Sequence, residues 1–342
     1  MGRKEWKRFD FREQVMDLVR SGRTLSEDEI QFIKEKYSGA GGLVPSNWSY
    51  GQFFTPPNVV SFLHDLIGIK LNPGLTLEPS VGGGAFLNGL DESLCTGIEM
   101  SRESASVASI CYPDARIINE AAETIFPYSK PSEMGGKFDY VIGNPPFGVK
   151  MGWTSEFTQG KFKKLSSEAV FLEIAYRACR PGGKIALILP DGLLSNPGYE
   201  PIRKWMMQRC FVRASISLPS ETFYFTGASV KTSILFFEKF AEGVTEEDAK
   251  DSLIFMAIVE KIGWDSRGRL TNDSDLPKIL AAYRSFAAGG PIEILDDAER
   301  DVIATEVDLP VPAGMDVLED KEPANEEIVA GCEKAEQISL FG

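Results

Sequence analysis

The sequence is poor in the residues that build disulfide frameworks, zinc sites and histidine-based active sites. Its 342 residues include five cysteines and one histidine. The cysteines are scattered, odd in number and form no C-x-x-C pair, which argues against a disulfide framework or zinc site and favours a reducing compartment. The histidine, His64, lies among apolar residues. We expect it to be a helix residue with no catalytic role.

Long apolar runs are also absent. No stretch approaches the roughly 18 apolar residues of a membrane span, and the charged first residues are not followed by the apolar region of a signal peptide. A chain of this length can bury a substantial core in one large domain or two. We therefore expect a cytoplasmic protein that binds neither a membrane nor a metal.

The most informative motif is a loop formed by Asn144, Pro145, Pro146 and Phe147. It follows an apolar run over residues 138–143 that predicts a buried parallel strand. Because the prolines fix φ and carry no N–H, the Asn144 side-chain oxygen and the Pro145 carbonyl can point at one amino group. Phe147 can stack on a planar ring. The motif predicts a slot for a planar amine; the alternative is a plain strand-to-loop turn.

A glycine-rich turn follows an earlier short strand over residues 75–77. A strand, a glycine turn and a helix start together form the ligand-binding element of a doubly wound sheet. Glycines let the backbone approach a ligand closely, and an acid at the head of the turn suits an ammonium better than a pyrophosphate. The residues that we expect at the ligand are Glu78, Ser80, Gly82, Gly84 and Phe86.

Further acids follow the next two predicted strands. Residues 96–98 lead to Glu99, whose carboxylate suits the two hydroxyls of a ribose. Residues 117–119 lead to Glu120. Strands and helices alternate to about residue 239, which predicts a doubly wound, Rossmann-like α/β sheet. Within it we expect helices at residues 56–69 and 166–180 and a buried strand at 184–189.

These motifs carry a family resemblance. Glu78-Pro-Ser-x-Gly-x-Gly-Ala-Phe followed by Asn144-Pro-Pro-Phe resembles the S-adenosylmethionine-dependent adenine-N6 DNA methyltransferases, most of all the modification subunits of type I restriction systems. A third block, with Phe54, Thr55 and Pro56, resembles the segment that helps to close over the methionine end of the cofactor. The resemblance spans roughly residues 38–285.

The sequence departs from this family in two ways. Val81 and Gly83 stand where the family usually has Cys and Ser. The large helical N-terminal domain of the type I subunits is replaced by about fifty residues, in which a capping box from Ser26 to Glu29 precedes a predicted helix.

The resemblance implies methyl transfer from S-adenosylmethionine to N6 of an adenine flipped out of DNA. It implies that Asn144 and Pro145 hold the amine and that Phe147 stacks on the base. The acids are implied on the cofactor: Glu99 at the ribose, Glu78 near the amino-acid end and Glu120 at the adenine amine. Candidates for stacking on the other side of the base are Phe223, Tyr224 and Phe225.

Two other functions stay open. Enzymes that methylate a guanine of ribosomal RNA or a glutamine of a protein share the Asn-Pro-Pro-aromatic loop. The chain could instead be a partner-dependent, non-autonomous subunit of a DNA-modification or defence complex. Since no target-recognition domain is evident, a separate DNA-specificity subunit is an expected partner.

The net charge of −14 is concentrated at one end of the chain. Residues 291–342 contain 15 acidic and 3 basic residues, a balance of −12, which leaves −2 for the preceding 290 residues. Basic residues gather at positions 3–23 and directly after the Asn144 loop, the latter being Lys150, Lys161, Lys163 and Lys164. This second cluster is either a solvated loop face or a contact for phosphates.

The last residues resemble the bacterial sliding-clamp-binding motif, Gln-x-x-Leu-Phe, through Gln337, Leu340 and Phe341. Two apolar anchors on a polar segment can enter a hydrophobic groove; the alternative is an apolar end that docks on its own domain.

We expect four regions: a helical extension and linker (1–43), a methyltransferase domain (44–240), a small appended unit (241–290) and an acidic, disordered tail (291–342). Such an enzyme would be associated with the nucleoid.

Overall fold

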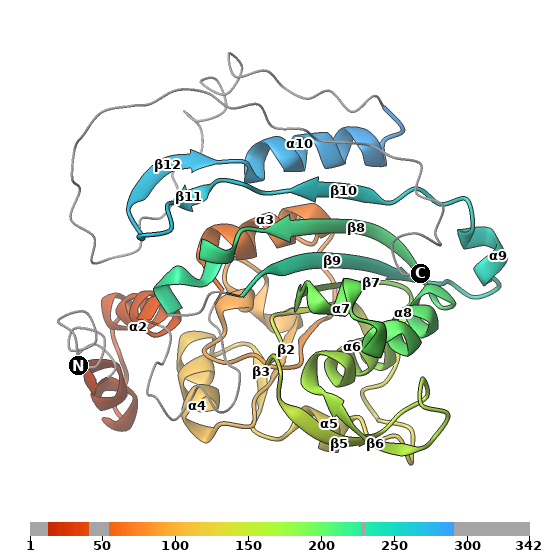
Figure 1. The fold of residues 1–342 in the computed structure, drawn as a ribbon. Coiled ribbons are helices and arrows are strands. Elements are labelled where there is room, and N and C mark those ends of the chain that lie inside the picture. The colour runs from red at the N-terminus through yellow and green to blue at the C-terminus, as the bar shows by residue number, and fades with distance from the viewer. Residues whose placement is uncertain (1–12, 41–54, 227–229, 291–342) are drawn as a thin grey trace.

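An eight-stranded sheet forms the centre of the protein (Figure 1). The computed structural model describes residues 13–40, 55–226 and 230–290. The strands lie in the spatial order β10 (Phe255–Ile258), β8 (Cys210–Leu218), β9 (Thr232–Lys239), β7 (Cys179–Pro190), β4 (Phe138–Gly143), β1 (Thr76–Glu78), β2 (Cys95–Ile98) and β3 (Arg116–Ile118). Neighbours are parallel except at β9, which is antiparallel to β7 and β8. The doubly wound α/β prediction is confirmed.

The order of the strands reverses between β1 and β4. Strands β1, β2 and β3 follow one another toward one edge of the sheet, whereas β4 lies on the other side of β1. Their parallel register places Leu77 beside Val141, so both strands end at the same edge of the sheet. Such a switch point leaves a crevice at the carboxyl ends of the strands, where ligands bind in open α/β sheets.

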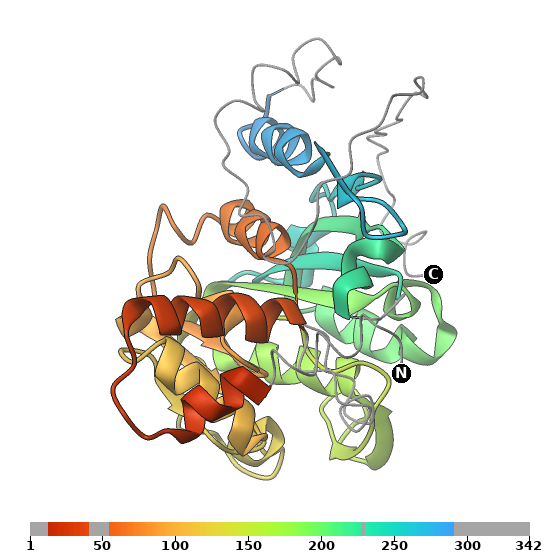
Figure 2. The same ribbon diagram turned by 90° about the vertical axis from the view of Figure 1, so that its left-hand side faces the viewer.

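Helices cover both faces of this sheet (Figures 1 and 2). One face packs on α3 (Pro57–Ile67) and α10 (Leu276–Ala287), and the other packs on α6 (Ser167–Ala178) and α8 (Glu200–Met207). The apolar strands are buried on both faces, as parallel sheets require. The helices predicted at 56–69 and 166–180 are therefore present as α3 and α6. The shorter segments are α5 (Ala122–Ile125), α7 (Gly192–Ser195), η3 (Glu92–Leu94), η4 (Pro197–Tyr199) and η5 (Ser220–Thr226).

His64 lies on helix α3, as predicted, and is fully buried. Its Nε2 atom lies 2.9 Å from the carbonyl oxygen of Phe86. Burial lowers the pKa of His64 to about 4, so the ring is neutral at physiological pH. The imidazole thus fixes a backbone carbonyl beside the glycine turn.

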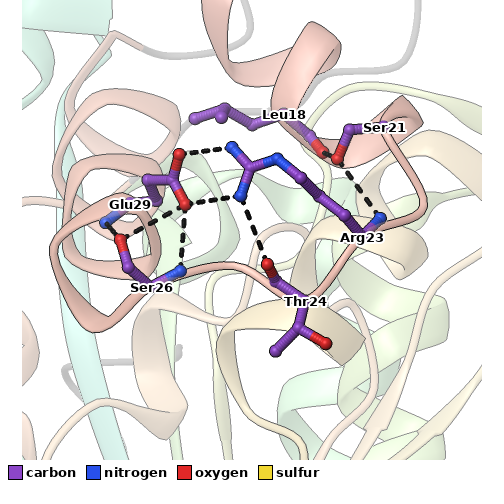
Figure 3. Close-up of polar contacts among 6 residues, drawn as sticks. All are labelled: Leu18, Ser21, Arg23, Thr24, Ser26 and Glu29. Atoms are coloured by element: carbon purple, nitrogen blue, oxygen red, sulfur yellow. Dashed lines mark hydrogen bonds and ion pairs between the residues drawn. The ribbon is translucent and has the colours of Figure 1, made fainter.

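The N-terminal extension is helical, at residues 13–20 and in α2 (Glu27–Ala40). The predicted capping box is present: the Ser26 N–H donates to Glu29 Oε2 at 2.9 Å, and the Glu29 N–H donates to Ser26 Oγ at 3.3 Å (Figure 3). Arg23 forms an ion pair with the same carboxylate. The hydrogen bond from Arg23, followed by that from Ser26, lowers the pKa of Glu29 to about 2. The helix start is thereby fixed by local contacts alone.

The extension packs against the glycine turn through α4 (Arg102–Cys111) and Tyr37. The Tyr37 hydroxyl lies 2.9 Å from Ser104 Oγ, which holds the ring in place. A Cβ atom on Gly83 would lie 2.5 Å from this ring. The departure from the family serine at position 83 therefore has a steric reason in this chain. The predicted helix start after the turn is the short 3₁₀ helix η2 (Ala85–Leu87).

We expect Gly83→Ala to destabilise the folded state by about 1–3 kcal/mol, because the added methyl group overpacks the contact with Tyr37. Urea unfolding of the single variants and of Gly83→Ala/Tyr37→Ala measures the coupling between the two positions. In the Tyr37→Ala background the methyl group has room, so its cost should fall. Purely additive effects would contradict a direct contact.

A β-hairpin carries the lysine cluster that the sequence left open as a solvated loop face or a phosphate contact. It consists of β5 (Lys150–Thr154) and β6 (Phe162–Ser166), joined as a separate two-stranded sheet. The hairpin packs against α6, on the same side of the central sheet as α5 (Figure 1).

Residues 241–290 contribute to the central sheet. After α9 (Glu246–Ala249), β10 pairs with β8 as an edge strand, and β11 (Ile262–Trp264) and β12 (Leu270–Ser274) form a hairpin. The Asn58 side-chain N–H donates to the Ile262 carbonyl at 2.9 Å, which ties this hairpin to α3. The domain boundaries stay a prediction. The region from 291 onward lies outside the described residues.

Every cysteine of the described residues is buried and free: Cys95, Cys111, Cys179 and Cys210. Burial raises the pKa of each thiol. The described part of the chain contains no cluster of three or more histidine, cysteine, aspartate or glutamate side chains suited to a metal. None of its helices has the length and apolar composition of a membrane span.

Candidate active site

A cavity of about 270 Å³ opens at the carboxyl ends of β1, β2 and β4. It lies at the switch point of the sheet, where the fold leaves room for a ligand. The residues that line it are Thr55, Glu78, Pro79, Ser80, Val81, Gly82, Gly83, Ala85, Phe86, Ile98, Glu99, Met100, Glu120, Ala121, Ala122, Glu123, Asn144, Pro146, Val149, Met151 and Phe171. The predicted cofactor acids and the predicted catalytic asparagine thus meet in one place.

Asn144 follows β4 directly and lines the cavity. Its side-chain N–H donates to Thr55 Oγ1 at 3.0 Å, and Thr55 is buried. This hydrogen bond fixes the orientation of the amide, since its nitrogen faces Thr55. The two sequence blocks that lie 89 residues apart are joined by a side-chain contact. Pro56, after Thr55, is the N-cap residue of α3.

The loop after Asn144 is held by the first residues of α6. The Ser167 hydroxyl donates to the Pro146 carbonyl at 2.6 Å, and the Gly148 N–H donates to Glu168 Oε2 at 3.0 Å. The other oxygen of Glu168 accepts a hydrogen bond from the Tyr199 hydroxyl. Both Ser167 and Glu168 are buried. These contacts hold the loop through Ser167 and Glu168, neither of which lines the cavity.

Glu78 ends β1 at the floor of the cavity, with 2% of its surface exposed. Its Oε2 atom has no hydrogen-bond partner among the described residues. Burial, and then the nearby carboxylate of Glu99, raise the pKa of Glu78 well above its ordinary value. A buried carboxyl group with an open oxygen is well suited to a cationic ligand group.

Glu99 follows β2 and is also buried. Its two oxygens accept hydrogen bonds from the Gly82 N–H at 3.0 Å and from the Ser101 N–H at 2.7 Å. Burial raises the pKa of Glu99, and these two hydrogen bonds act against that shift. Each oxygen keeps a second lone pair, so the carboxylate can still accept from a pair of hydroxyls.

The remaining predicted cofactor residues surround these acids. Ser80 Oγ is buried without a hydrogen-bond partner in the described part of the chain. Glu120 lies exposed at the rim of the cavity, and its Oε1 accepts from the Ala121 N–H at 3.1 Å. Gly82 and Gly84 have φ values of 54° and 91°, which favour glycine. Gly82 and Phe86 line the cavity, whereas Gly84 packs against Tyr112 behind it.

Of the aromatic residues predicted to stack on the base, Phe147, Phe223 and Tyr224 do not line the cavity. Phe147 and Phe223 are buried in the apolar cluster around α3, and Phe223 is fully buried. Tyr224 is half-buried and lies against Gly268, where an added Cβ would meet its ring. Phe54 and the side chain of Phe225 lie outside the described residues, as do Gln337, Leu340 and Phe341. The stacking roles stay predictions.

Three apolar walls of the cavity were missed from the sequence: Val149, Met151 and Phe171. Val149 and Met151 flank the start of β5, and Phe171 lies on α6. Their positions depend on the hairpin packing against α6, a tertiary contact. The only local signal was the sequence position of Val149 and Met151 shortly after the Asn144 loop.

The strand order and the cavity at the β1–β4 switch point define the fold of the class I methyltransferases that use S-adenosylmethionine. The open oxygens of Glu78 and Ser80 and the carboxylate of Glu99 fit that cofactor, because they offer acceptors to an ammonium group and to a ribose.

The chain belongs to the N-6 DNA methylase family, whose model matches residues 45–313. It is 23% identical over 240 residues to defense against restriction protein B of Escherichia phage P1, covering 69% of this chain and 10% of that protein. It is 27% identical over 194 residues to type II methyltransferase M.HincII of Haemophilus influenzae, covering 53% and 36%. These relatives bear out the resemblance seen in the motifs.

A solved structure of a type I restriction-modification system shares the fold, with a TM-score of 0.55 and 20% sequence identity. The match covers 84% of this chain and 64% of that one. The chain therefore spans less than two thirds of the length of each of these proteins.

Proposed function

We propose that this protein transfers a methyl group from S-adenosylmethionine to N6 of adenine in DNA. The observation that carries the proposal is that the Asn144 amide and the buried acid Glu78 open into the same cavity. One end of the cavity suits the cofactor, and the other presents the hydrogen-bonding groups for an amine. Membership of the N-6 DNA methylase family and the type II relative support adenine as the target.

The chain supplies orientation and charge for this reaction. Glu78, Ser80 and Glu99 would hold the cofactor. When bound, S-adenosylmethionine supplies a methyl group that its sulfonium has already activated, so no metal is required. The Asn144 side-chain oxygen and the Pro145 carbonyl accept the hydrogens of the adenine amine and draw its lone pair out of conjugation with the ring. Because Ser167 and Glu168 hold the loop in advance, little reorganisation is needed.

The proposal is tested by incubating the purified chain with methyl-tritiated cofactor and plasmid DNA. Label that co-elutes with N6-methyladenine after digestion to nucleosides is the expected result. Parallel incubations with ribosomal RNA and with bacterial protein test the two alternative substrates. Label only in guanine or in glutamine would overturn the assignment.

We also propose that the choice of target sequence lies on a second chain. The fold neighbour comes from a type I system, and the segment after β9 contributes an edge strand and a short hairpin to this domain. Methylation that requires an added DNA-specificity subunit would support this. The sliding-clamp contact through Gln337, Leu340 and Phe341, and the nucleoid association, stand as proposals from the sequence.

A further inference from the structure

The lysines of the β5–β6 hairpin lie on two opposite faces. Residues paired across antiparallel strands lie on the same face, and successive residues alternate. Lys164 pairs with Gly152, which places it on the face of Lys150, two residues earlier on β5. Lys163 pairs with Trp153, on the opposite face. Trp153 is buried in the core around α6, so its face is the inner one and that of Lys150 and Lys164 is the outer one.

The hairpin is rigidly attached to the body of the protein. The buried carboxylate of Glu173, on α6, accepts from the Trp153 indole N–H at 3.2 Å and from the Glu156 N–H at 3.2 Å. At the tip, Ser155 and Thr158 are buried, and the Ser155 hydroxyl donates to Thr158 Oγ1 at 2.7 Å. The lysines are therefore presented from a fixed platform.

This platform adjoins the cavity. Lys150 stands between Val149 and Met151, both of which line the cavity. The cavity rim also carries acids, Glu120 and Glu123, on the segment after β3. The rim thus has an acidic side near the cofactor end and a basic side at the hairpin. A polyanion that enters the cavity is repelled by the first side and attracted by the second.

The charge of the hairpin is uncompensated. Residues 150–166 contain four lysines and Glu156, a balance of +3, in a chain whose net charge is −14. In the part of the chain that the structure describes, none of these lysines forms an ion pair, whereas Lys204, Lys250 and Lys261 each do. Free exposed lysines on a rigid face are the usual contacts of proteins to DNA phosphates.

We propose that the outer face of the β5–β6 hairpin binds the phosphate backbone of duplex DNA next to the flipped base, through Lys150 and Lys164. This inference rests on the proposed function for its choice of polyanion. Each lysine neutralises about one phosphate. These contacts would hold the DNA strand along the hairpin, with the target adenine over the adjoining cavity.

The test is the salt dependence of duplex binding by the full chain, measured by fluorescence anisotropy with a labelled oligonucleotide over a series of KCl concentrations. The slope of log K against log salt should fall by about 1 in Lys164→Ala and by about 2 in Lys150→Ala/Lys164→Ala. Lys163→Ala is the matched control for Lys164→Ala, because its side chain is also exposed and carries the same charge but projects from the opposite face of the hairpin. Its slope should stay near the wild-type value. Cofactor binding measured by calorimetry should be equal in all variants, which shows that they are folded.

The inference is overturned if Lys163→Ala changes the slope as much as Lys164→Ala, if the wild-type chain does not bind the duplex, or if it binds ribosomal RNA more tightly. Lysine-dependent duplex binding without methylation of adenine would support the hairpin contact and overturn the proposed function. The two proposals are therefore separable in the same preparation.

Discussion

Asn144→Ala should lower the rate of methyl transfer by on the order of 10³-fold or more and leave cofactor affinity within about threefold of wild type. The substitution removes the side-chain oxygen that accepts from the amine, while Glu78, Ser80 and Glu99 are untouched. Single-turnover incorporation of tritiated methyl groups into DNA measures the rate, and calorimetry with the cofactor measures the affinity.

Thr55→Val is the control for this result. Thr55 accepts the hydrogen bond of the Asn144 amide nitrogen at 3.0 Å, so its loss frees the amide to rotate but keeps the oxygen. We expect a loss of less than about tenfold, near the 1–1.5 kcal/mol of one hydrogen bond. An Asn144→Ala variant with full activity would show that the loop has no catalytic role.

Glu78→Gln should weaken cofactor binding by at least about tenfold, or about 1.4 kcal/mol, and reduce the dependence of that affinity on pH. In the wild-type protein, burial and then the charge of Glu99 raise the pKa of Glu78. Without a ligand, this carboxyl group therefore keeps its proton at pH values at which a free glutamate is ionised. A cationic ligand favours the ionised carboxylate. Affinity should therefore rise with pH, and binding should release protons, measurable by calorimetry in buffers of different ionisation enthalpy.

The same substitution should have the opposite effect on stability. The pKa of Glu78 is higher in the folded than in the unfolded state, so its contribution to stability is present at low pH. That contribution is lost as pH rises above the unfolded pKa and toward the folded one. Since glutamine does not ionise, Glu78→Gln should be the more stable protein above neutral pH in urea unfolding. A variant that loses both affinity and stability at that pH would contradict this account.

The sequence predicted the parts of the fold that local patterns determine. Buried parallel strands read as short apolar runs, and each ends at the edge where ligands bind, so Glu78, Glu99 and Asn144 could be assigned to one edge before the structure was known. The capping box at Ser26 and Glu29 is also a local contact.

The hairpin could not be predicted in this way. Its inner residues, such as Trp153 and Met151, are buried or half-buried only because they pack against α6 and, for Trp153, Glu173. The lysines of this segment, taken from the sequence alone, are equally typical of a solvated loop. Strand β10 was missed as a member of the central sheet for a similar reason. It is short and only partly buried, and it gains its place by pairing with β8, about forty residues earlier. Non-local pairing leaves little trace in local sequence.

The buried cysteines have a practical consequence. Cys95 and Cys179 begin β2 and β7, at the edge of the sheet opposite the cavity, and burial raises the pKa of each thiol to about 12, so neither reacts with disulfide reagents in the native state. In a Cys332→Ser background, the rate at which such a reagent titrates thiols would report how often the sheet opens. Cys95, close to the glycine turn, would register local opening there. A bound cofactor should slow the labelling of Cys95 more than that of Cys179. The labelling rates of these two cysteines would therefore report motion around the cavity.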